Sequence, residues 1–239
     1  MGNELRLDHY LVQEKQIESR TKAQQLIKNA LVYVDGKSIT KPSFKIDKSV
    51  VVSIVEHKSY VSRSAHKLLD FLVTLSLDLK GKTALDIGSS TGGFTQVLLE
   101  HNVKSVVCVD VGRDQLHHSL RNDVRVEVRE GCDIRKYESL NPFDIVVSDV
   151  AFISLHYILD DVDRLSAKDI ILLFKPQFEV GREVKRDKNG VVVDKKAIEN
   201  GMIRFEDACK LKGWNLVKKA PSTLTGKDGN LEYCYYFTK

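Results

Sequence analysis

Apolar residues in the first quarter of the chain follow short helical and strand patterns. Helical spacing predicts one helix at 5–12 and a second helix that starts near Ser19. Short β-branched runs follow at 32–34 and 49–55, and Asp35-Gly36 predicts a tight turn after the first run. Two short helices and a small sheet indicate a small α+β module rather than a large domain.

A different pattern fills the rest of the chain. β-branched apolar runs alternate with helical stretches, which is typical of a parallel sheet covered by helices on both faces. We therefore expect a small module at 1–57, a linker at 58–61 and an α/β domain at 62–239. The stretch 178–194 has no periodic pattern and exceeds a usual connection, which predicts a functional loop. The expected strands of the domain lie at 83–88, 105–110, 124–128, 143–149, 169–175, 214–218 and 231–238.

The composition of the 239-residue chain, with 42% hydrophobic and 29% charged residues, excludes disordered and collagen-like classes. No apolar run approaches the roughly 20 residues that span a bilayer, and the first residues lack the basic-then-apolar order of a signal peptide. We therefore expect a cytoplasmic monomer without stable membrane association. The four cysteines form no C-x-x-C motif and the histidines form no H-E-x-x-H motif, so we expect reduced thiols and no metal site.

The net charge of +4 is concentrated in one part of the chain. Residues 1–80 contain 13 Lys and Arg against 9 Asp and Glu, whereas the remaining residues are balanced. A basic module of this size is typical of proteins that bind nucleic acid, although so small an excess also arises by chance. The candidate contacts are Arg6, Arg20, Lys22 and Lys28 in the module, together with Arg63, Arg182, Lys185 and Arg186.

The first expected strand of the α/β domain runs into a glycine-rich turn that begins with Asp86-x-Gly88. Glycines at such a turn let the backbone approach a ligand at the carboxyl edge of the sheet. The turn has neither the G-x-G-x-x-G nor the G-K-[ST] motif, and a carboxylate at Asp86 would repel a phosphate but suits a cationic amino-acid group. Asp110 ends the second strand and is placed to accept hydrogen bonds from ribose hydroxyls, and Asp133 follows the third and could accept from an adenine amino group.

Three acids at the ends of three successive strands fit an S-adenosylmethionine site better than a NAD site, with S-adenosylhomocysteine as the product. The alternative is that acids simply cap strand ends and helix starts. The candidate cofactor-binding residues are Asp86, Gly88, Ser89, Ser90, Thr91, Gly92, Gly93, Phe94, Asp110, Val111, Asp133 and Asp149.

Two neighbouring strands bring a carboxylate, Asp149, and an amine, Lys175, to the same edge of the expected sheet. A strand that is buried on both faces has little reason to end on a lysine unless the amine is paired, because an unpaired buried ammonium is costly. The residues after Asp149 lack the Pro-Pro-aromatic motif of exocyclic-amine methyltransferases, and no nucleophilic cysteine replaces it. A paired surface lysine is the alternative, but the nearby cofactor turn favours a catalytic pair.

With two further residues, these side chains carry a family resemblance. Lys67, Asp149, Lys175 and Glu232 match in order the Lys-Asp-Lys-Glu tetrad of the FtsJ-like ribose 2'-O-methyltransferases. The whole chain resembles the TlyA (hemolysin A) type of ribosomal RNA methyltransferase, in which the catalytic domain follows an RNA-binding domain first described in ribosomal protein S-four. The segments ArgLeuAspHisTyrLeu, SerArgThrLysAla and ValTyrValAspGlyLys are similar to that domain, although Ala30-Leu31 stands in place of its usual glycine.

The resemblance implies a Rossmann-like class I methyltransferase fold, α/β with a mostly parallel seven-stranded sheet, after a small α+β RNA-binding domain. It also implies methylation of cytidine riboses in ribosomal RNA or ribosomal subunits. In this interpretation Lys175 is the candidate base, Asp149 orients it, Lys67 supplies a second positive charge, and Glu232 fixes Lys67 and the ribose. No metal is required.

Two other classes of function remain open at this point. One is a non-catalytic RNA-binding ribosome-assembly factor with a vestigial cofactor pocket, against which the intact Asp86, Asp149 and lysines argue. The other is a membrane-lysing hemolysin, which would need an amphipathic segment with a large apolar face and a basic face, and none is apparent.

Overall fold

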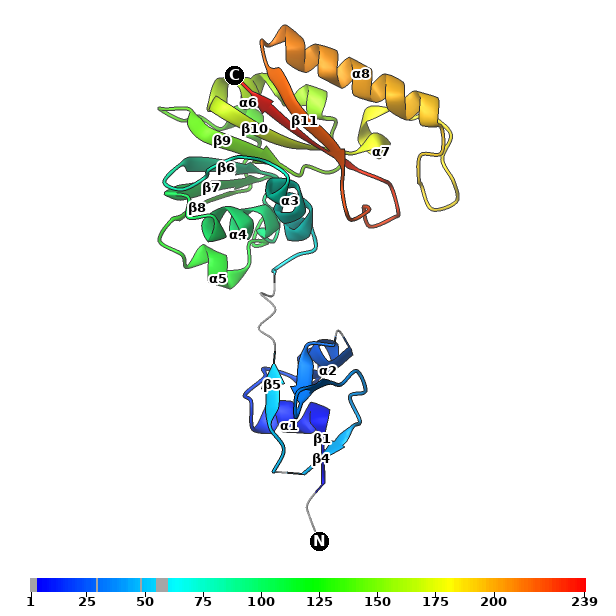
Figure 1. Cartoon of the computed structure of the whole chain (residues 1–239). Helices are drawn as coiled ribbons and strands as arrows, with labels where there is room; N and C mark the ends of the chain where they lie inside the picture. Colours follow the sequence, from blue (N-terminus) through cyan, green and yellow to red (C-terminus); the bar gives the residue numbers. More distant parts are fainter. Residues whose placement is uncertain (1–3, 29, 48, 55–59) are drawn as a thin grey trace. The chain divides into compact units, whose positions relative to one another are not determined.

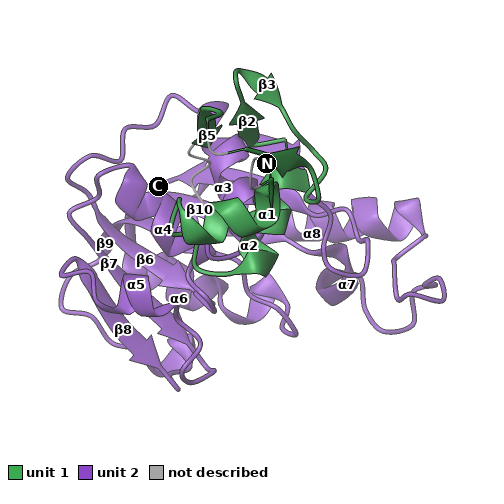
Figure 2. Cartoon of the chain, turned by 90° about the horizontal axis from the view of Figure 1, so that it is seen from below, with its two compact units in different colours: residues 1–59 green, residues 60–239 purple. Residues whose placement is uncertain are grey.

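The computed structural model describes residues 4–28, 30–47, 49–54 and 60–239. Its contacts divide the chain into two compact units, 1–59 and 60–239 (Figure 2). Residues 57 to 59, which contain the predicted end of the small module and half of the predicted linker, lie outside the described residues. These boundaries therefore stay predictions.

The smaller unit packs two helices against short strands (Figure 1). Helices α1 (Leu7–Gln13) and α2 (Arg20–Lys28) confirm the two predicted helices. The strands are β1 (Leu5–Arg6), β2 (Val32–Val34), β3 (Lys37–Ser38), β4 (Lys45–Ile46) and β5 (Val52–Ile54). Strands β3, β2 and β5 form an antiparallel sheet in that order, and β1 pairs with β4.

The predicted turn in the smaller unit is confirmed. Asp35 and Gly36 have φ angles of +47° and +77°, and β2 pairs with β3 on either side of them. Both residues lie in the left-handed region, as a two-residue hairpin turn requires. The sequence prediction lacks β1, β3 and β4, because a two-residue strand is too short to show an alternating pattern.

A seven-stranded sheet forms the centre of the larger unit. Its strands are β6 (Thr83–Ile87), β7 (Ser105–Asp110), β8 (Val126–Glu130), β9 (Phe143–Ser148), β10 (Ser166–Phe174), β11 (Asn215–Pro221) and β12 (Tyr233–Thr238). They lie in the order β11-β12-β10-β9-β6-β7-β8. Strands β6 to β10 pair in parallel, whereas β12 runs antiparallel to β10 and β11. The predicted α/β fold with a mostly parallel sheet is confirmed.

Helices cover both faces of this sheet. One face carries α3 (Ser64–Val73), α4 (Gly93–Glu100) and α5 (His118–Arg121), and the other carries α6 (Leu159–Leu165) and α8 (Lys195–Leu211). Short helical turns lie at α7 (Pro176–Glu179), η1 (Ile134–Lys136) and η2 (Leu155–Tyr157).

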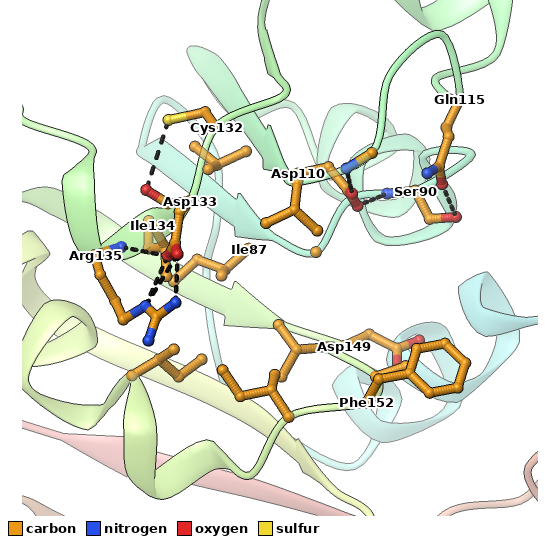
Figure 3. Close-up of a pocket in the computed structure, with 18 residues that line it drawn as sticks. Ile87, Ser90, Asp110, Gln115, Cys132, Asp133, Ile134, Arg135, Asp149 and Phe152 are labelled. Carbon is orange, nitrogen blue, oxygen red and sulfur yellow. Dashed lines mark hydrogen bonds and ion pairs between the residues drawn. The ribbon is translucent and has the colours of Figure 1, made fainter.

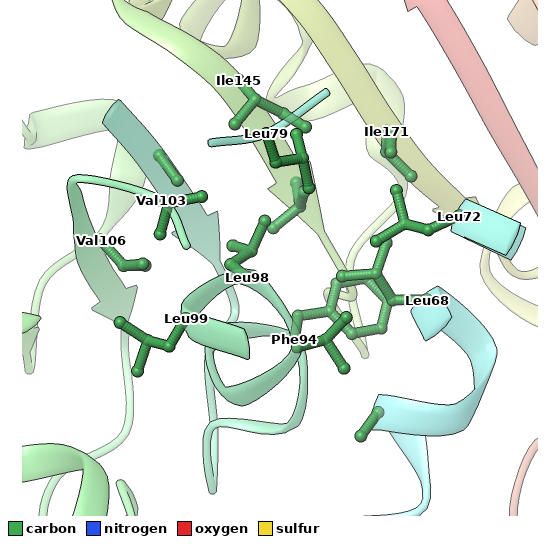
Figure 4. Packing of buried hydrophobic residues seen from close by; sticks show 14 of the residues in the cluster. Leu68, Leu72, Leu79, Phe94, Leu98, Leu99, Val103, Val106, Ile145 and Ile171 are labelled. Atoms are coloured by element: carbon green, nitrogen blue, oxygen red, sulfur yellow. The ribbon is translucent and has the colours of Figure 1, made fainter. Parts of the chain in front are cut away.

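The two apolar clusters of the larger unit follow from strand alternation. Ile145 faces the cluster with α3 and α4, and the next residue, Val146, faces the cluster with α6 and α8. Figure 4 shows Leu68, Phe94 and Ile171 packed in the first cluster. Because both faces are buried, the carboxyl edge of the sheet is free to form a ligand site.

Two details differ from the prediction, and a third agrees with it. The helix expected at 155–165 is divided into η2 and α6, with Ile158 between them. The N-cap of α3 is Arg63 without a side-chain hydrogen bond, because the hydroxyls of Ser62 and Ser64, both candidates for the cap, lie 2.6 Å from each other. The loop at 178–194 is largely without regular structure, as predicted, except for the end of α7 and one β-bridge. In the described part of the chain, no helix has the length and apolarity to cross a membrane.

Candidate active site

Four neighbouring strands bring charged side chains to one edge of the sheet. Asp86 lies in β6, Asp110 ends β7, Asp149 follows β9 and Lys175 follows β10. These strands are parallel, so their carboxyl ends lie at the same edge. The chain places β7 and β9 on opposite sides of β6, and open α/β sheets bind ligands at such a reversal of strand order.

Two adjoining cavities open at this edge. The larger, about 540 Å³, lies beyond the ends of β6, β7 and β9 (Figure 3). The smaller, about 250 Å³, lies beside Lys175 and the start of α4, and the two cavities share the walls at Gly88 and Asp149. Their combined size is that of a small-molecule or cofactor site. The predicted cofactor-binding residues that line them are Asp86, Gly88, Ser89, Ser90, Thr91, Phe94, Asp110, Val111, Asp133 and Asp149.

Glycines shape the turn between β6 and α4. Gly88 has a φ of +78°, and a β-carbon there would lie 3.2 Å from Val150 Cα. Gly92 has a φ of +94°, and a β-carbon there would lie 2.3 Å from a methyl group of Leu120. A side chain at either position would be strained by its backbone and by its neighbours. Gly92 and Gly93 line neither cavity, so they shape the turn rather than the walls of the cavities.

Asp86 is a fully buried carboxylate with an incomplete set of partners. Its Oδ2 accepts a hydrogen bond of 2.6 Å from the Thr95 hydroxyl, whereas its Oδ1 has no hydrogen-bond partner among the described residues. Burial raises the pKa of Asp86 to about 7, and the nearby carboxylates of Asp149 and Asp110 act in the same direction against the Thr95 hydrogen bond. A cation that enters the smaller cavity would satisfy the free oxygen and the charge.

Asp110 holds the turn between β6 and α4 in place. Its two oxygens accept hydrogen bonds from the backbone N–H groups of Ser90, at 2.8 Å, and Gly112, at 2.7 Å (Figure 3). Each carboxylate oxygen has two lone pairs, so both can also accept from a ligand hydroxyl. The side chain therefore fits its predicted role and also fixes the wall around it.

Asp133 lies at the far wall of the larger cavity and is already paired. Its Oδ2 lies 2.5 Å from an Arg135 guanidinium nitrogen, and its Oδ1 accepts from the Arg135 N–H at the start of η1. The Arg135 hydrogen bonds lower the pKa of Asp133 to about 2. The carboxylate is thus a permanently charged acceptor, and Arg135 is a cavity residue that the sequence prediction lacks.

The four residues of the predicted tetrad form two ion pairs, in which Lys67, Glu232 and Lys175 are buried and Asp149 is partly buried. Lys67, from α3, lies 2.5 Å from the Glu232 carboxylate just before β12. Lys175 Nζ lies 2.6 Å from Asp149 Oδ1, as an ion pair without hydrogen-bond alignment. Both lysines are only 8% exposed. Each amine therefore has one carboxylate that fixes it, which is the pairing expected from the sequence.

The Cys234 thiol on β12 is buried and lies 4.0 Å from the backbone carbonyl oxygen of Lys67. Burial raises the pKa of Cys234 to about 12, Lys67 acts to lower it, and Asp149 and Glu232 act to raise it. In the sheet, Phe174 of β10 pairs with Tyr233 of β12, so the adjacent Lys175 and Glu232 bring the two ion pairs to neighbouring strand ends. All four cysteines are free thiols, and the described residues contain no group of three or more His, Cys, Asp or Glu placed to hold a metal ion.

Residues 60–239 match the model of the FtsJ-like methyltransferase family. The chain belongs to this family. Residues 5–52 match the S4 domain, so the FtsJ-like domain follows an S4 domain as the resemblance implies. The larger unit is therefore a methyltransferase.

Relatives of this FtsJ-like methyltransferase match along nearly the whole chain. A Campylobacter jejuni protein named 23S rRNA (cytidine-2'-O)-methyltransferase TlyA is 42% identical, over 98% of this chain and 100% of its own length. A Mycobacterium tuberculosis protein named 16S/23S rRNA (cytidine-2'-O)-methyltransferase TlyA is 37% identical, over 98% and 89%. A solved structure of a candidate hemolysin from Streptococcus thermophilus is 31% identical with a TM-score of 0.71, over 99% and 88%.

The basic side chains that the sequence predicts as RNA contacts in the S4 domain differ in whether they already pair with an acidic residue. Arg6 and Arg20 both donate to the buried carboxylate of Asp8. Lys22 pairs with Glu18 at 3.1 Å on the exposed side of α2, and Lys28 is exposed. The sequence pattern does not single out Asp8, because acidic residues are common near the start of a helix.

The basic residues predicted in the FtsJ-like domain divide in the same way. Arg63, Arg182 and Lys185 are exposed. The Arg186 guanidinium instead donates to the carbonyls of Arg182, Val184, Gln177 and Gly181. Arg186 therefore holds its own loop together, and the RNA-binding role of these side chains stays a prediction.

Two further residues near the cavities are absent from the sequence prediction. Phe152, three residues after Asp149, is 93% exposed at the rim of the larger cavity and has a φ of +66° (Figure 3). An exposed aromatic face of this kind is what RNA-binding proteins use to stack on a base. Glu179 is buried, which raises its pKa, and it accepts from the Ser154 hydroxyl at 2.6 Å and the Leu155 N–H at 2.8 Å. It therefore anchors the loop that carries Phe152.

Proposed function

We propose that this protein transfers a methyl group from S-adenosylmethionine to the 2'-hydroxyl of cytidine riboses in ribosomal RNA. The observation that carries the proposal is the pair of lysine–carboxylate contacts, Lys67 with Glu232 and Lys175 with Asp149. Lys175 and Asp149 line the smaller cavity, whereas Lys67 and Glu232 line neither cavity. Such a cluster suits the removal of a proton from a weakly acidic hydroxyl. The full-length relatives named as cytidine-2'-O-methyltransferases support the same substrate.

The side chains around the two cavities fit S-adenosylmethionine, and S-adenosylhomocysteine would be the product. The free Oδ1 of Asp86 suits the ammonium group of the methionine part. Asp110 keeps lone pairs for ribose hydroxyls, and Asp133 is a charged acceptor for an adenine amino group. When bound, S-adenosylmethionine supplies an electrophilic methyl group.

In this proposal Lys175 first loses its own proton to solvent, and the neutral amine then accepts the proton of the ribose hydroxyl. The ribose oxygen forms a bond to the methyl carbon as the carbon–sulfur bond breaks, which leaves S-adenosylhomocysteine. Asp149 orients that amine through the 2.6 Å ion pair. Lys67 stabilises the negative charge that develops on the ribose oxygen, and Glu232 fixes Lys67 at 2.5 Å. Because two lysines supply the positive charge, the proposal includes no metal ion. Holding both reactants in line can supply several kcal/mol of the rate enhancement.

The proposed partners are ribosomal RNA or ribosomal subunits, which the S4 domain would bind through phosphates. A role in ribosomal RNA modification agrees with the cytoplasmic, monomeric protein without stable membrane association that the sequence predicts. Those three properties stay predictions.

The test is methylation of ribosomal subunits and free ribosomal RNA that lack the modification, with isotope-labelled S-adenosylmethionine and the product nucleosides identified by mass spectrometry. We expect label in 2'-O-methylcytidine at defined sites. A protein that binds RNA but transfers no label to either substrate would contradict the proposal and favour the assembly-factor alternative. Label in a base rather than a ribose would contradict the role of the tetrad.

A further inference from the structure

The loop between α7 and α8 contains a small hairpin, residues 185–193. A β-bridge between Arg186 and Val192 joins its two sides. The Arg186 guanidinium also donates to the carbonyl of Gln177 at 3.3 Å. Because Gln177 lies two residues after Lys175, the hairpin is tied to the end of the strand that carries this lysine.

The hairpin also contacts the loop between β11 and β12. Asn230 of that loop is buried, with 3% of its surface exposed, and its Oδ1 accepts a hydrogen bond of 3.0 Å from the Val192 N–H. Among the described residues, this is the one hydrogen bond between the two loops. Asn230 lies two residues before Glu232, so the hairpin is also tied to the segment that carries the tetrad carboxylate.

The backbone of the β11–β12 loop lies close against the Glu232 side chain. The Asn230 carbonyl accepts from the Gly226 N–H at 2.8 Å, and the Glu232 carbonyl accepts from the Ser222 N–H at 2.8 Å. A β-carbon at Gly226 would lie 2.6 Å from Glu232 Oε1, whereas Oε2 pairs with Lys67. A displacement of Asn230 would therefore move Glu232 and the Lys67 amine that it fixes.

Hydrogen bonding, rather than size, distinguishes asparagine at this position. Val192 is only 6% exposed, so its N–H needs an acceptor inside the protein. An apolar side chain in place of Asn230 would fill the same space but leave that N–H without a partner, which costs as much as a lost hydrogen bond. The Asn230 acceptor thus fixes the hairpin in one position against the loop that leads to Glu232.

We propose that Asn230 is a positioning residue for methyl transfer. Through its contact with Val192 it docks the hairpin onto the neighbouring ends of β10 and β12, and so holds Glu232, and through Glu232 also Lys67, in the reactive geometry. This rests on the proposed function, because it takes the tetrad as the site of the reaction.

A purely structural role for the contact is the alternative, in which it stabilises the two loops without affecting the reaction. The two roles differ in the single-turnover rate at saturating RNA and S-adenosylmethionine. A misplaced catalytic group lowers that rate, and a displacement of about 1 Å costs up to about 100-fold. A contact that is only structural lowers the thermal stability and leaves the saturated rate unchanged.

The experiment measures single-turnover methylation of ribosomal RNA by the full chain. We expect Asn230→Ala to be about tenfold slower or more at saturation. Its affinity for S-adenosylmethionine should stay within about twofold of the wild type, because Asn230 lines neither cavity of the active site. Asn189→Ala is the matched control, since this exposed asparagine of the same hairpin makes no side-chain hydrogen bond among the described residues. A wild-type saturated rate for Asn230→Ala would overturn the proposal.

Two further variants apply if Asn230→Ala does not fold. Asn230→Leu fills the same space without an acceptor, so we expect the same loss of rate as for alanine. Asn230→Asp keeps an acceptor oxygen, so we expect a saturated rate within about threefold of the wild type, even if a buried carboxylate lowers the stability. Equal saturated rates for the leucine and aspartate variants would overturn the proposal.

A double variant tests whether Asn230 acts through Glu232. In a Glu232→Gln background, Asn230→Leu should slow transfer by at most about twofold further, because the group that it positions is already lost. Fully additive losses would contradict a positioning role toward Glu232.

The wild type separates this proposal from the function on which it rests. Normal transfer by the wild type, together with equal rates for the leucine and aspartate variants, would reject the positioning role alone. A wild type that transfers no methyl group to ribosomal RNA would reject the proposed function and this inference together.

Discussion

Two carboxylates at opposite ends of the cofactor cavities have opposite electrostatic surroundings. Asp86 is buried without a cationic partner, and its pKa is raised to about 7. Asp133 is paired with Arg135, and its pKa is lowered to about 2. At Asp133 the protein itself supplies the countercharge, whereas at Asp86 a bound ligand would supply it. The catalytic edge resembles the Asp133 end, because Asp149 and Glu232 each have a lysine.

Breaking the ion pair between Lys175 and Asp149 should have the largest effect of these substitutions, and the effect should be on the rate of methyl transfer. Lys175→Ala is expected to lower the single-turnover rate of methyl transfer about 1,000-fold or more, because general base and field effects are both lost. Cofactor affinity should change much less, since Lys175 makes its contribution chiefly in the transition state. Equal losses of rate and of cofactor affinity would contradict this division.

Replacing the unpaired carboxylate of Asp86 should have opposite effects on stability and on cofactor affinity. Asp86→Asn is expected to raise the free energy of unfolding of the cofactor-free protein at pH 8 by up to about 4 kcal/mol, because no buried charge then lacks a partner. The same variant should bind S-adenosylmethionine at least about tenfold more weakly. Chemical denaturation and calorimetry measure the two quantities, and a variant that loses stability would contradict the assignment.

The raised pKa of Asp86 also predicts how stability and binding depend on pH. Between its ordinary value of 3.8 and about 7, the folded state keeps a proton that the unfolded state has released. The contribution of Asp86 to the free energy of unfolding therefore falls as pH rises through this window, and is constant below and above it. If the carboxylate pairs with the cofactor ammonium, affinity should rise from pH 5.5 to 7 with release of a proton. Calorimetry in buffers of different ionisation enthalpy counts that proton, and Asp86→Asn should release none.

Replacing Asp133 should have the smallest effect on cofactor affinity. Asp133→Asn is expected to weaken S-adenosylmethionine only a few-fold, because an amide still accepts hydrogen bonds and Arg135 remains exposed to water. Its binding should keep the wild-type pH dependence, since the pKa of Asp133 lies far below the working range. A loss as large as that of Asp86→Asn would mean that the two ends do not differ in the way described.

The sheet and its ligand edge could be predicted from the sequence because burial on both faces leaves continuous apolar strands. The strands that carry Asp86, Asp110 and Asp149 are visible as such runs, and the glycines after Asp86 mark the turn. Neighbouring parallel strands then bring these acids together without any further information. The tetrad members Lys67 and Glu232 carry no such signal alone, and only the resemblance to a family identifies them.

The partners of the charged groups could not be predicted. Asp8 receives donors from residues 12 and 16 positions away, and Glu232 pairs with a lysine 165 positions away, distances that no local periodicity records. Arg186 resembles an RNA contact in the sequence, yet its guanidinium is used on backbone carbonyls of its own loop. Partners of this kind depend on tertiary packing, so net charge alone overstates the number of side chains that are free to bind RNA.

In the proposed mechanism Lys175, oriented by Asp149, takes the proton from a ribose hydroxyl. The most direct test is the pH dependence of single-turnover methylation of ribosomal RNA by the wild type and by Lys175→Arg, each saturated with S-adenosylmethionine. The wild-type rate should rise with pH, because only the neutral amine accepts a proton, and Lys175→Arg should lose about 1,000-fold because a guanidinium stays protonated. An arginine variant with a near-normal rate would contradict base catalysis and leave Lys175 with electrostatic positioning alone.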